Sequence, residues 1–220
     1  MRRILLLVVP LALAIGLTAA SATADQGART WQVTVENLTP AGSQPLSPPL
    51  FVVHGQRVDV WSVGQIANHG VAAIAEDANN APLESALPSL SGVRDVFTGA
   101  GGPIPPGTSR SYLVQANGAR DRLTLLTMLV NTNDAFTGLD SLQFRNQGRM
   151  VFGMAYDAGS ERNNELATHI PGPCCNNPFV RDPEGALIAP HPGITGVGDL
   201  DPAVYNWTGP AAKITVERIP

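Results

Sequence analysis

The two ends of the chain carry the pattern that most constrains its fold. Residues 31–36 read Trp-Gln-Val-Thr-Val-Glu and residues 212–217 read Ala-Lys-Ile-Thr-Val-Glu, so apolar and polar side chains alternate strictly in both. A repeat of two residues predicts a half-buried β-strand, with one set of side chains in the core and the other in water. Because first and last strands are often paired in β-sandwiches, we expect these two strands in one sheet.

The rest of the chain favours short strands with long irregular connections. Gly and Pro contribute 22 and 19 of the 220 residues, and only 15% of residues are charged, which fits strands better than helices. The length suits one sizeable core rather than two domains. We therefore predict an all-β, antiparallel sandwich, with one or two short helices within 63–90 that cover an end of it. Further strands are expected at 50–53, 58–61, 112–115, 123–130 and 150–156, the third and fourth forming a hairpin around Asn117-Gly118.

The first 24 residues have the three parts of a secretory signal peptide. Arg2-Arg3 is the charged region, 4–17 is an apolar stretch, and Ala22-Thr-Ala24 is a small-x-small cleavage site. The apolar stretch is shorter than the roughly 20 residues of a membrane-spanning helix. We expect signal-peptide removal, a short linker at 25–29 and one domain at 30–220.

The expected location is outside the cytoplasm: extracellular, periplasmic or at the cell surface. No later segment is apolar enough to predict a span. The formal charge of −4 becomes −6 when Arg2 and Arg3 are removed. This acidity argues against nucleic acid as a partner and against simple attraction to anionic lipid.

Two acidic segments each follow an apolar run that predicts a buried strand. The segment 131–141 follows 123–130, and the segment 156–161 follows a run that begins at Met150. Carboxylates crowded together without Lys or Arg repel one another, so such a cluster usually needs a cation, and Ca²⁺ accepts six to eight oxygen ligands in flexible geometry. The spacing is not that of an EF-hand. The predicted metal ligands are the four acidic side chains of these segments, Asp134, Asp140, Asp157 and Glu161.

The same residues resemble the spondin N-terminal domain family in its short bacterial form. The matching motifs are Asp-Ala-Phe-Thr-Gly-Leu-Asp-Ser at 134–141 and Tyr-Asp-Ala-Gly-Ser-Glu at 156–161. The resemblance covers most of the chain after residue 30. It implies a C2-like β-sandwich that binds Ca²⁺, of the kind found in secreted adhesion and matrix proteins. It places the family's calcium carboxylates on Asp134, Asp157 and Glu161, the last being one methylene longer than the family's common Asp.

Cys174 and Cys175 are adjacent. An even cysteine count in a secreted protein suggests a disulfide, although adjacent cysteines close only a tight ring. A vicinal disulfide, free thiols and intermolecular pairing all remain open. Two adjacent cysteines without paired histidines do not form a zinc site.

We predict a secreted, calcium-binding module for adhesion or surface recognition, with no catalytic residues. Its partner could be a surface protein, a glycan or a lipid. One alternative is a metal-dependent hydrolase using the acidic cluster, but such enzymes keep an open metal position beside a general base. Another is a structural envelope protein without a dedicated ligand. His191 with Asp199 or Asp201 is a weaker catalytic candidate, because no Gly-x-Ser-x-Gly elbow accompanies it.

Overall fold

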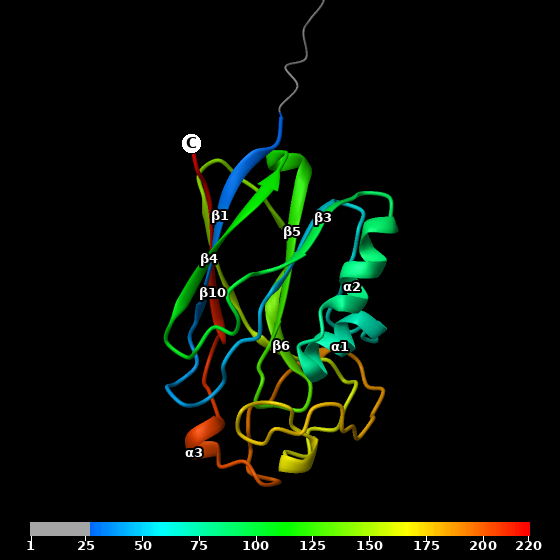
Figure 1. Cartoon of the computed structure of the whole chain (residues 1–220), viewed down its shortest axis with the longest axis vertical. Helices are drawn as coiled ribbons and strands as arrows, with labels where there is room; N and C mark the ends of the chain where they lie inside the picture. Colours follow the sequence, from blue (N-terminus) through cyan, green and yellow to red (C-terminus); the bar gives the residue numbers. More distant parts are fainter. Residues whose placement is uncertain (1–26) are drawn as a thin grey trace, which may run out of the picture.

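Two antiparallel sheets face each other and enclose the core (Figure 1). The computed structural model describes residues 27–220, so the expected signal peptide at 1–24 and the first two linker residues lie outside the described residues. One sheet has the order β4-β1-β10-β7 and the other the order β3-β2-β5-β6-β8-β9. The all-β sandwich predicted from the sequence is confirmed. The strands are β1 (Arg29–Asn37), β2 (Leu50–Gly55), β3 (Val93–Thr98), β4 (Ser109–Ala116), β5 (Asp121–Met128), β6 (Ala135–Gln143), β7 (Arg149–Gly153), β8 (Ala155–Asp157), β9 (Ala189–Pro190) and β10 (Ala212–Arg218).

The predicted pairing of the first and last strands is confirmed. β1 and β10 are antiparallel neighbours at the centre of the four-stranded sheet, in a register that runs from Trp31 opposite Arg218 to Asn37 opposite Ala212. The alternation in sequence becomes alternation in burial: Trp31, Val33 and Val35 are fully buried, and the residues between them are partly exposed. The period-two pattern therefore identifies the core-facing side of this sheet correctly.

β5 is buried on both faces, which explains why its sequence is a continuous apolar run rather than an alternating one. Leu123 and Leu125 belong to the core between the sheets, whereas Leu126 belongs to a second apolar cluster on the outer face. That cluster lies beneath the helices α1 (His69–Asp77) and α2 (Ala81–Ala86) and the short 3₁₀ turn η1 (Leu87–Ser89).

The helices cover a face of the sandwich, so the expectation that they cover an end is wrong. Val71 and Ile74 of α1 pack in one cluster with Leu50 and Val52 of β2, and Figure 1 shows both helices alongside the six-stranded sheet. The Asn68 side chain caps α1 by accepting hydrogen bonds from two backbone N–H groups. Burying the outer apolar face of β2 and β5 requires such a cover, because the sheet would otherwise expose it to water.

Three local predictions are corrected by the topology. Residues 58–61 do not form a strand. β4 and β5 lie in different sheets and are joined through the 3₁₀ turn η2 (Gly118–Arg120), so the hairpin around Asn117-Gly118 does not exist. The run 150–156 is divided at Met154 into β7 and β8, which also belong to different sheets.

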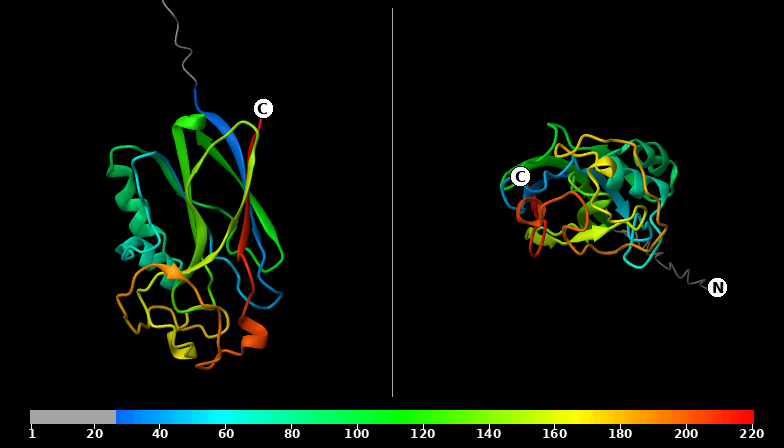
Figure 2. Two further views of the ribbon diagram at one scale, coloured as in Figure 1. Left: turned by 180° about the vertical axis from the view of Figure 1, so that it is seen from behind. Right: turned by 90° about the horizontal axis from the view of Figure 1, so that it is seen from below.

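The long connection between β8 and β10, residues 158–211, covers one end of the sandwich. It includes the 3₁₀ turn η3 (Ala167–His169), β9 and the short helix α3 (Pro202–Tyr205). Figures 1 and 2 place these segments at the end opposite to the one where β1 begins and β10 ends. Within residues 27–220, no helix is both long enough and apolar enough to span a bilayer.

Candidate acidic site

The acidic site forms where β6 begins and β8 ends. Asp134 immediately precedes β6 and Asp157 closes β8, and because the two strands are antiparallel neighbours, these positions lie side by side. Ala135 is opposite Asp157 in the register, and the N–H of Ala158 donates to the carbonyl oxygen of Asp134 at 3.1 Å. The structure thus brings together two carboxylates that are 23 residues apart in the sequence.

A glycine turn then brings the backbone of the next residues to Asp134. Gly159 has φ = +67°, and a Cβ at this position would lie 2.6 Å from the carbonyl carbon and oxygen of Ala186, so only glycine fits. Beyond the turn, the N–H groups of Ser160 and Glu161 donate to Asp134 Oδ2 at 2.8 and 2.9 Å. The Ser160 hydroxyl donates to the same oxygen at 3.1 Å.

The second oxygen of Asp134 has no such partner. Asp134 is fully buried, and its Oδ1 has no hydrogen-bond donor among the described residues. Neither carboxylate oxygen of the buried Glu161 accepts a hydrogen bond from the described residues, although Oε1 is within ion-pair distance of Arg181. Burial, followed by the nearby charge of Asp157, raises the pKa of Asp134 to about 7. Burial, followed by the charges of Glu76 and Asp134, raises the pKa of Glu161 to about 8. Unpaired acceptors in such a place are costly unless a proton or a cation compensates them.

Asp157 is better satisfied than its neighbours. Its Oδ1 accepts the N–H of Gly159 at 2.6 Å, and its Oδ2 accepts the Asn163 side-chain amide at 2.6 Å. Burial raises the pKa of Asp157, and these two hydrogen bonds oppose the shift by favouring the charged form. Asn163 in turn links Asp157 to the Gly-rich loop at 191–199, since its Oδ1 accepts from His191 Nε2 at 2.9 Å.

An arginine that the sequence analysis did not include lies against Glu161. Arg181 Nε is 3.1 Å from Glu161 Oε1 and 2.5 Å from Glu76 Oε2, and the same guanidinium pairs with Asp77. Glu76 and Asp77 end α1, so the guanidinium ties that helix to the long connection. More than one hundred residues separate Arg181 from Glu76 and Asp77 in the sequence. No local sequence pattern predicts their contact.

Asp140 does not join the other predicted ligands. It is the exposed residue within β6, where partial burial of its carboxylate and the charge of Asp59 raise its pKa and His54 opposes the shift. Six residues of strand separate it from Asp134, or about 20 Å at 3.3 to 3.4 Å per residue. Most of the segment 131–141 is β6, so the expectation that its two aspartates share one metal site is wrong.

The cluster is not a finished metal site in this conformation. Within residues 27–220, no three Asp, Glu, His or Cys side chains are gathered as they would be around an ion. The donor set nevertheless suits a hard cation, because Asp134 Oδ1 and Glu161 Oε2 are buried oxygens with neither a hydrogen-bond donor nor an ion-pair partner among the described residues. Asp134, Asp157 and Glu161 are the side chains that could hold such an ion.

The loop at 191–199 is organised around hydrogen bonds rather than around a catalytic pair. His191 Nδ1 accepts the N–H of Gly193 at 2.9 Å, so Nε2 carries the hydrogen that is donated to Asn163. Asp199 Oδ2 accepts the N–H of Ala167 at 2.9 Å, and Asp201 caps α3. In the described structure, neither carboxylate is hydrogen-bonded to His191. Burial lowers the pKa of His191 to about 4, against the opposing charge of Glu165.

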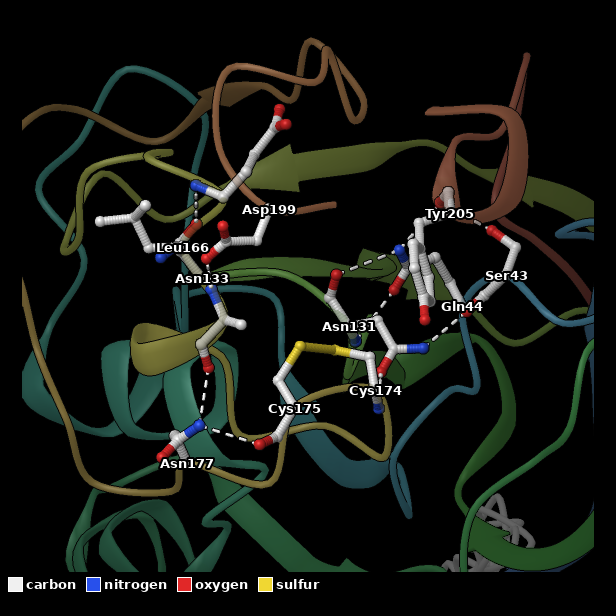
Figure 3. Close-up of a disulfide and its surroundings, with 12 residues drawn as sticks. Ser43, Gln44, Asn131, Asn133, Leu166, Cys174, Cys175, Asn177, Asp199 and Tyr205 are labelled. Atoms are coloured by element: carbon white, nitrogen blue, oxygen red, sulfur yellow. Dashed lines mark hydrogen bonds between the residues drawn. A yellow bond between two sulfur atoms is a disulfide. The ribbon is translucent and has the colours of Figure 1, made fainter. Parts of the chain in front are cut away.

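The cysteines form a vicinal disulfide beside this end of the sandwich (Figure 3). The N–H of Cys174 donates to Asn131 Oδ1 at 3.1 Å, and Asn131 Nδ2 donates to the carbonyl of Ser43 at 2.6 Å. The Asn177 side chain donates to the carbonyl of Cys175 at 2.8 Å. Of the pairings left open by the sequence, the structure has the vicinal one, fixed by amide side chains.

The comparison with known proteins agrees with the motifs in the acidic segments. The family model described as Spondin_N matches residues 38–161, which is more than half of the chain and includes Asp134, Asp157 and Glu161. The Spondin_N domain is a module of extracellular type. No curated protein matches the sequence. The chain belongs to the Spondin_N family.

Proposed function

We propose that this protein is a secreted, calcium-binding recognition module, and that Asp134, Asp157 and Glu161 hold one Ca²⁺ ion. The observation that carries the proposal is the buried Oδ1 of Asp134, which has no hydrogen-bond donor among the described residues while Oδ2 of the same carboxylate has three. A buried acceptor without a partner costs about 1–3 kcal/mol, and more when it is charged. A bound divalent cation would supply the missing positive charge at this point.

The surroundings of the cluster support an ion with an ordering role. Asp134 and Asp157 begin and end neighbouring strands, and Glu161 opens the long connection to β10. Holding the three carboxylates together therefore fixes that connection to the rigid sheet. Loops fixed on a rigid scaffold are where binding residues tend to lie, and loops ordered in advance lose less entropy when a partner binds.

Exposed apolar side chains at the same end support recognition of a partner there. Phe179 and Val197, both in the long connection, have 75% and 70% of their surface exposed, and Leu187 is half exposed. Covering these side chains with a partner would remove apolar surface from water, which favours association. A surface protein, a glycan or a lipid remains the proposed class of partner.

We favour binding over metal-dependent hydrolysis because of how the carboxylates are engaged. The candidate bases at the site are the same three carboxylates that would hold the ion, so binding the ion would leave none of them free beside an open metal position. The Glu161 carboxylate is also paired with Arg181, so its Oε1 already faces a cation.

The test is thermal unfolding of the mature protein with EDTA and with added CaCl₂, together with isothermal titration. At about 100-fold excess over Kd, a ligand that binds only the folded state adds about 2.7 kcal/mol. We expect Ca²⁺ to raise the melting temperature of the wild type and of the variant Asp140→Asn, because residue 140 lies on β6 away from the three proposed ligands. Asp157→Asn should abolish the response.

The control is informative because Asp140 carries the same charge and lies in the same sequence motif. A loss of the calcium response in Asp140→Asn alone would assign the ion to a different place. A melting temperature of the wild type that is identical in EDTA and in CaCl₂, with no heat of binding, would refute the calcium proposal.

A further inference from the structure

A polar pocket of about 420 Å³ lies at the end of the sandwich remote from the acidic site. It is formed by the start of β1, the connection between β4 and β5, and the connection between β6 and β7. Figure 1 shows the beginning of β1 and the end of β10 at this same end. The polar lining consists of two guanidinium groups and four side-chain amides, Arg29, Arg145, Asn117, Gln143, Asn146 and Gln147.

The segments that line the pocket carry a net positive charge, although the whole chain is acidic. The two lining connections, 117–122 and 143–149, contain four arginines and a single acidic residue, Asp121. Asp121 is buried and paired with Arg94, so it offsets little of the positive charge around the pocket. The exposed Glu217 lies beside Gly148. Among the described residues, no carboxylate lies within ion-pair distance of Arg145.

The lining is held in place by hydrogen bonds within the protein. The carbonyl of Ala119 accepts from Arg122 Nη1 and from Gln143 Nε2, both at 3.0 Å, which joins the two connections. Arg29 Nη1 donates to Asn146 Oδ1 at 3.2 Å. Arg29, Gln143 and Asn146 are therefore arranged before a ligand arrives, which lowers the entropy that these side chains lose on binding.

We propose that this pocket binds an anionic polysaccharide through its carboxylate or sulfate groups. The planar guanidinium of arginine matches carboxylate and sulfate oxygens with two parallel hydrogen bonds. Side-chain amides both donate and accept, which suits the hydroxyl groups of a sugar between its charged positions. Four amides beside arginines therefore suit an anionic sugar chain better than a simple anion.

The apolar residues argue against a membrane at this pocket. None of the large hydrophobic side chains exposed in residues 27–220 lines it, and Phe144, the lining residue with a large apolar side chain, is 1% exposed. A surface that inserts into a bilayer needs exposed apolar side chains beside its basic ones. A polysaccharide does not.

The proposal is independent of the calcium site. β6 runs from the acidic site to the pocket, and its nine residues span about 27 Å at 3.4 Å per residue. Binding can therefore be measured in EDTA, where the acidic site has no calcium and where calcium cannot bridge the glycan to the protein.

The experiment uses the mature protein and fluorescently labelled oligosaccharides of polygalacturonate and of dextran sulfate, with neutral dextran as the uncharged probe. We expect anisotropy to report binding to a charged probe, with no binding to dextran, and an affinity that falls as NaCl is raised. Arg145→Gln should weaken binding about tenfold, because it removes charged hydrogen bonds. Asn146→Asp, which places a carboxylate in the pocket and keeps both arginines, should also weaken it.

Arg57→Gln is the matched control. Arg57 is exposed in the turn after β2, lies outside the pocket lining and makes the same change in net charge. It should leave the affinity within about twofold, since its guanidinium is not among the groups that line the pocket and cannot bond a ligand held there. An equal loss in Arg57→Gln and Arg145→Gln, binding to phosphatidylglycerol vesicles but to neither charged glycan, or no binding to any probe would each overturn the proposal.

Discussion

The carboxylate of Glu165 accepts the backbone N–H of Thr195 at 2.6 Å, across 30 residues of the long connection. Its Oε1 also accepts the Thr195 hydroxyl at 2.9 Å, and its Oε2 accepts the N–H groups of Gly196 and Val197 at 2.6 and 3.1 Å. One buried side chain therefore satisfies three consecutive N–H groups of the Gly-rich loop. The loop keeps its shape without any secondary structure of its own.

Glu165→Gln should destabilise the fold by about 2–3 kcal/mol, because an amide nitrogen cannot accept hydrogen bonds and buried N–H groups lose their partner. Urea unfolding measures the change. The matched variant is Glu184→Gln, an exposed glutamate in the same connection, which should leave the free energy of unfolding nearly unchanged. Equal losses in the two variants would contradict the role assigned to Glu165.

Gly159→Ala should destabilise the protein by about 3 kcal/mol or more, because the new Cβ would overlap the backbone of Ala186 and the residue would keep a positive φ. Gly185→Ala is the comparison that separates the two causes. Gly185 also has a positive φ, +83°, but has nothing within 4 Å of the added atom, so the expected loss is only about 1–2 kcal/mol. Similar losses in the two variants, measured by denaturant unfolding, would show that the contact with Ala186 is unimportant.

His191 should make the protein less stable in acid. Its pKa is about 4 in the folded state, below the ordinary value of 6.5, so the unfolded chain binds more protons between these values. The stability that it contributes is complete above about pH 6.5 and is lost as the pH falls toward 4, by up to about 3 kcal/mol.

The measurement is the free energy of unfolding from pH 7 to pH 4 for the wild type and for His191→Gln. The glutamine side chain does not titrate between pH 7 and pH 4. The free energy of unfolding of the variant, relative to that of the wild type, should therefore increase as the pH falls. Parallel curves for the two proteins would mean that His191 does not titrate in this range. Changes from the acidic site appear in both proteins and cancel in the difference.

Arg181→Gln should destabilise the calcium-free protein by about 3 kcal/mol, because Glu161, Glu76 and Asp77 lose the cation that they share. The same variant should gain more from Ca²⁺ than the wild type does, since the guanidinium competes with an ion for Glu161. Thermal unfolding in EDTA and in CaCl₂ measures both effects.

Arg162→Gln is the control for this prediction. Arg162 pairs with Asp182 at 3.6 Å, with 60% of the Arg162 side chain and 37% of the Asp182 side chain exposed, and pairs in contact with water contribute little. It should change neither the stability in EDTA nor the response to calcium. A calcium response in Arg181→Gln smaller than that of the wild type would indicate that Arg181 supports the site rather than competing for it.

The sequence predicts those parts of the fold that depend on local patterns. The alternation at Trp31, Val33 and Val35 identifies the core face of β1, and the motif around Asp157 identifies two of the clustered carboxylates. The sheet to which a strand belongs is harder to predict from the sequence. An apolar run can continue in one sheet or cross to the other, as the run 150–156 does at Met154. The contact of Arg181 with Glu161 depends on how the long connection folds. The spacing of residues in the sequence does not predict that fold.

Asp140 illustrates the limit most clearly. It shares a segment with Asp134 and has the same charge, and a turn at this segment would have placed both at one site. The segment instead forms β6, because Phe136 and Leu139 are buried in the two apolar clusters on either side of the sheet. An extended strand carries the two aspartates apart, so burial of the apolar residues determines the position of the acidic ones.

The pairing of β1 with β10 has a mechanical consequence. Because the strands are antiparallel neighbours, Thr30 and Ile219 lie at the same end, and the N–H of Ile219 donates to the carbonyl of Thr30 at 3.1 Å. The hydrogen bonds of such a pair run perpendicular to the strands. Tension applied between these two residues would load the bonds one after another, as in a zipper, rather than shearing them together. The four-stranded sheet should therefore open at low force from this end, while the acidic site at the far end stays folded until last.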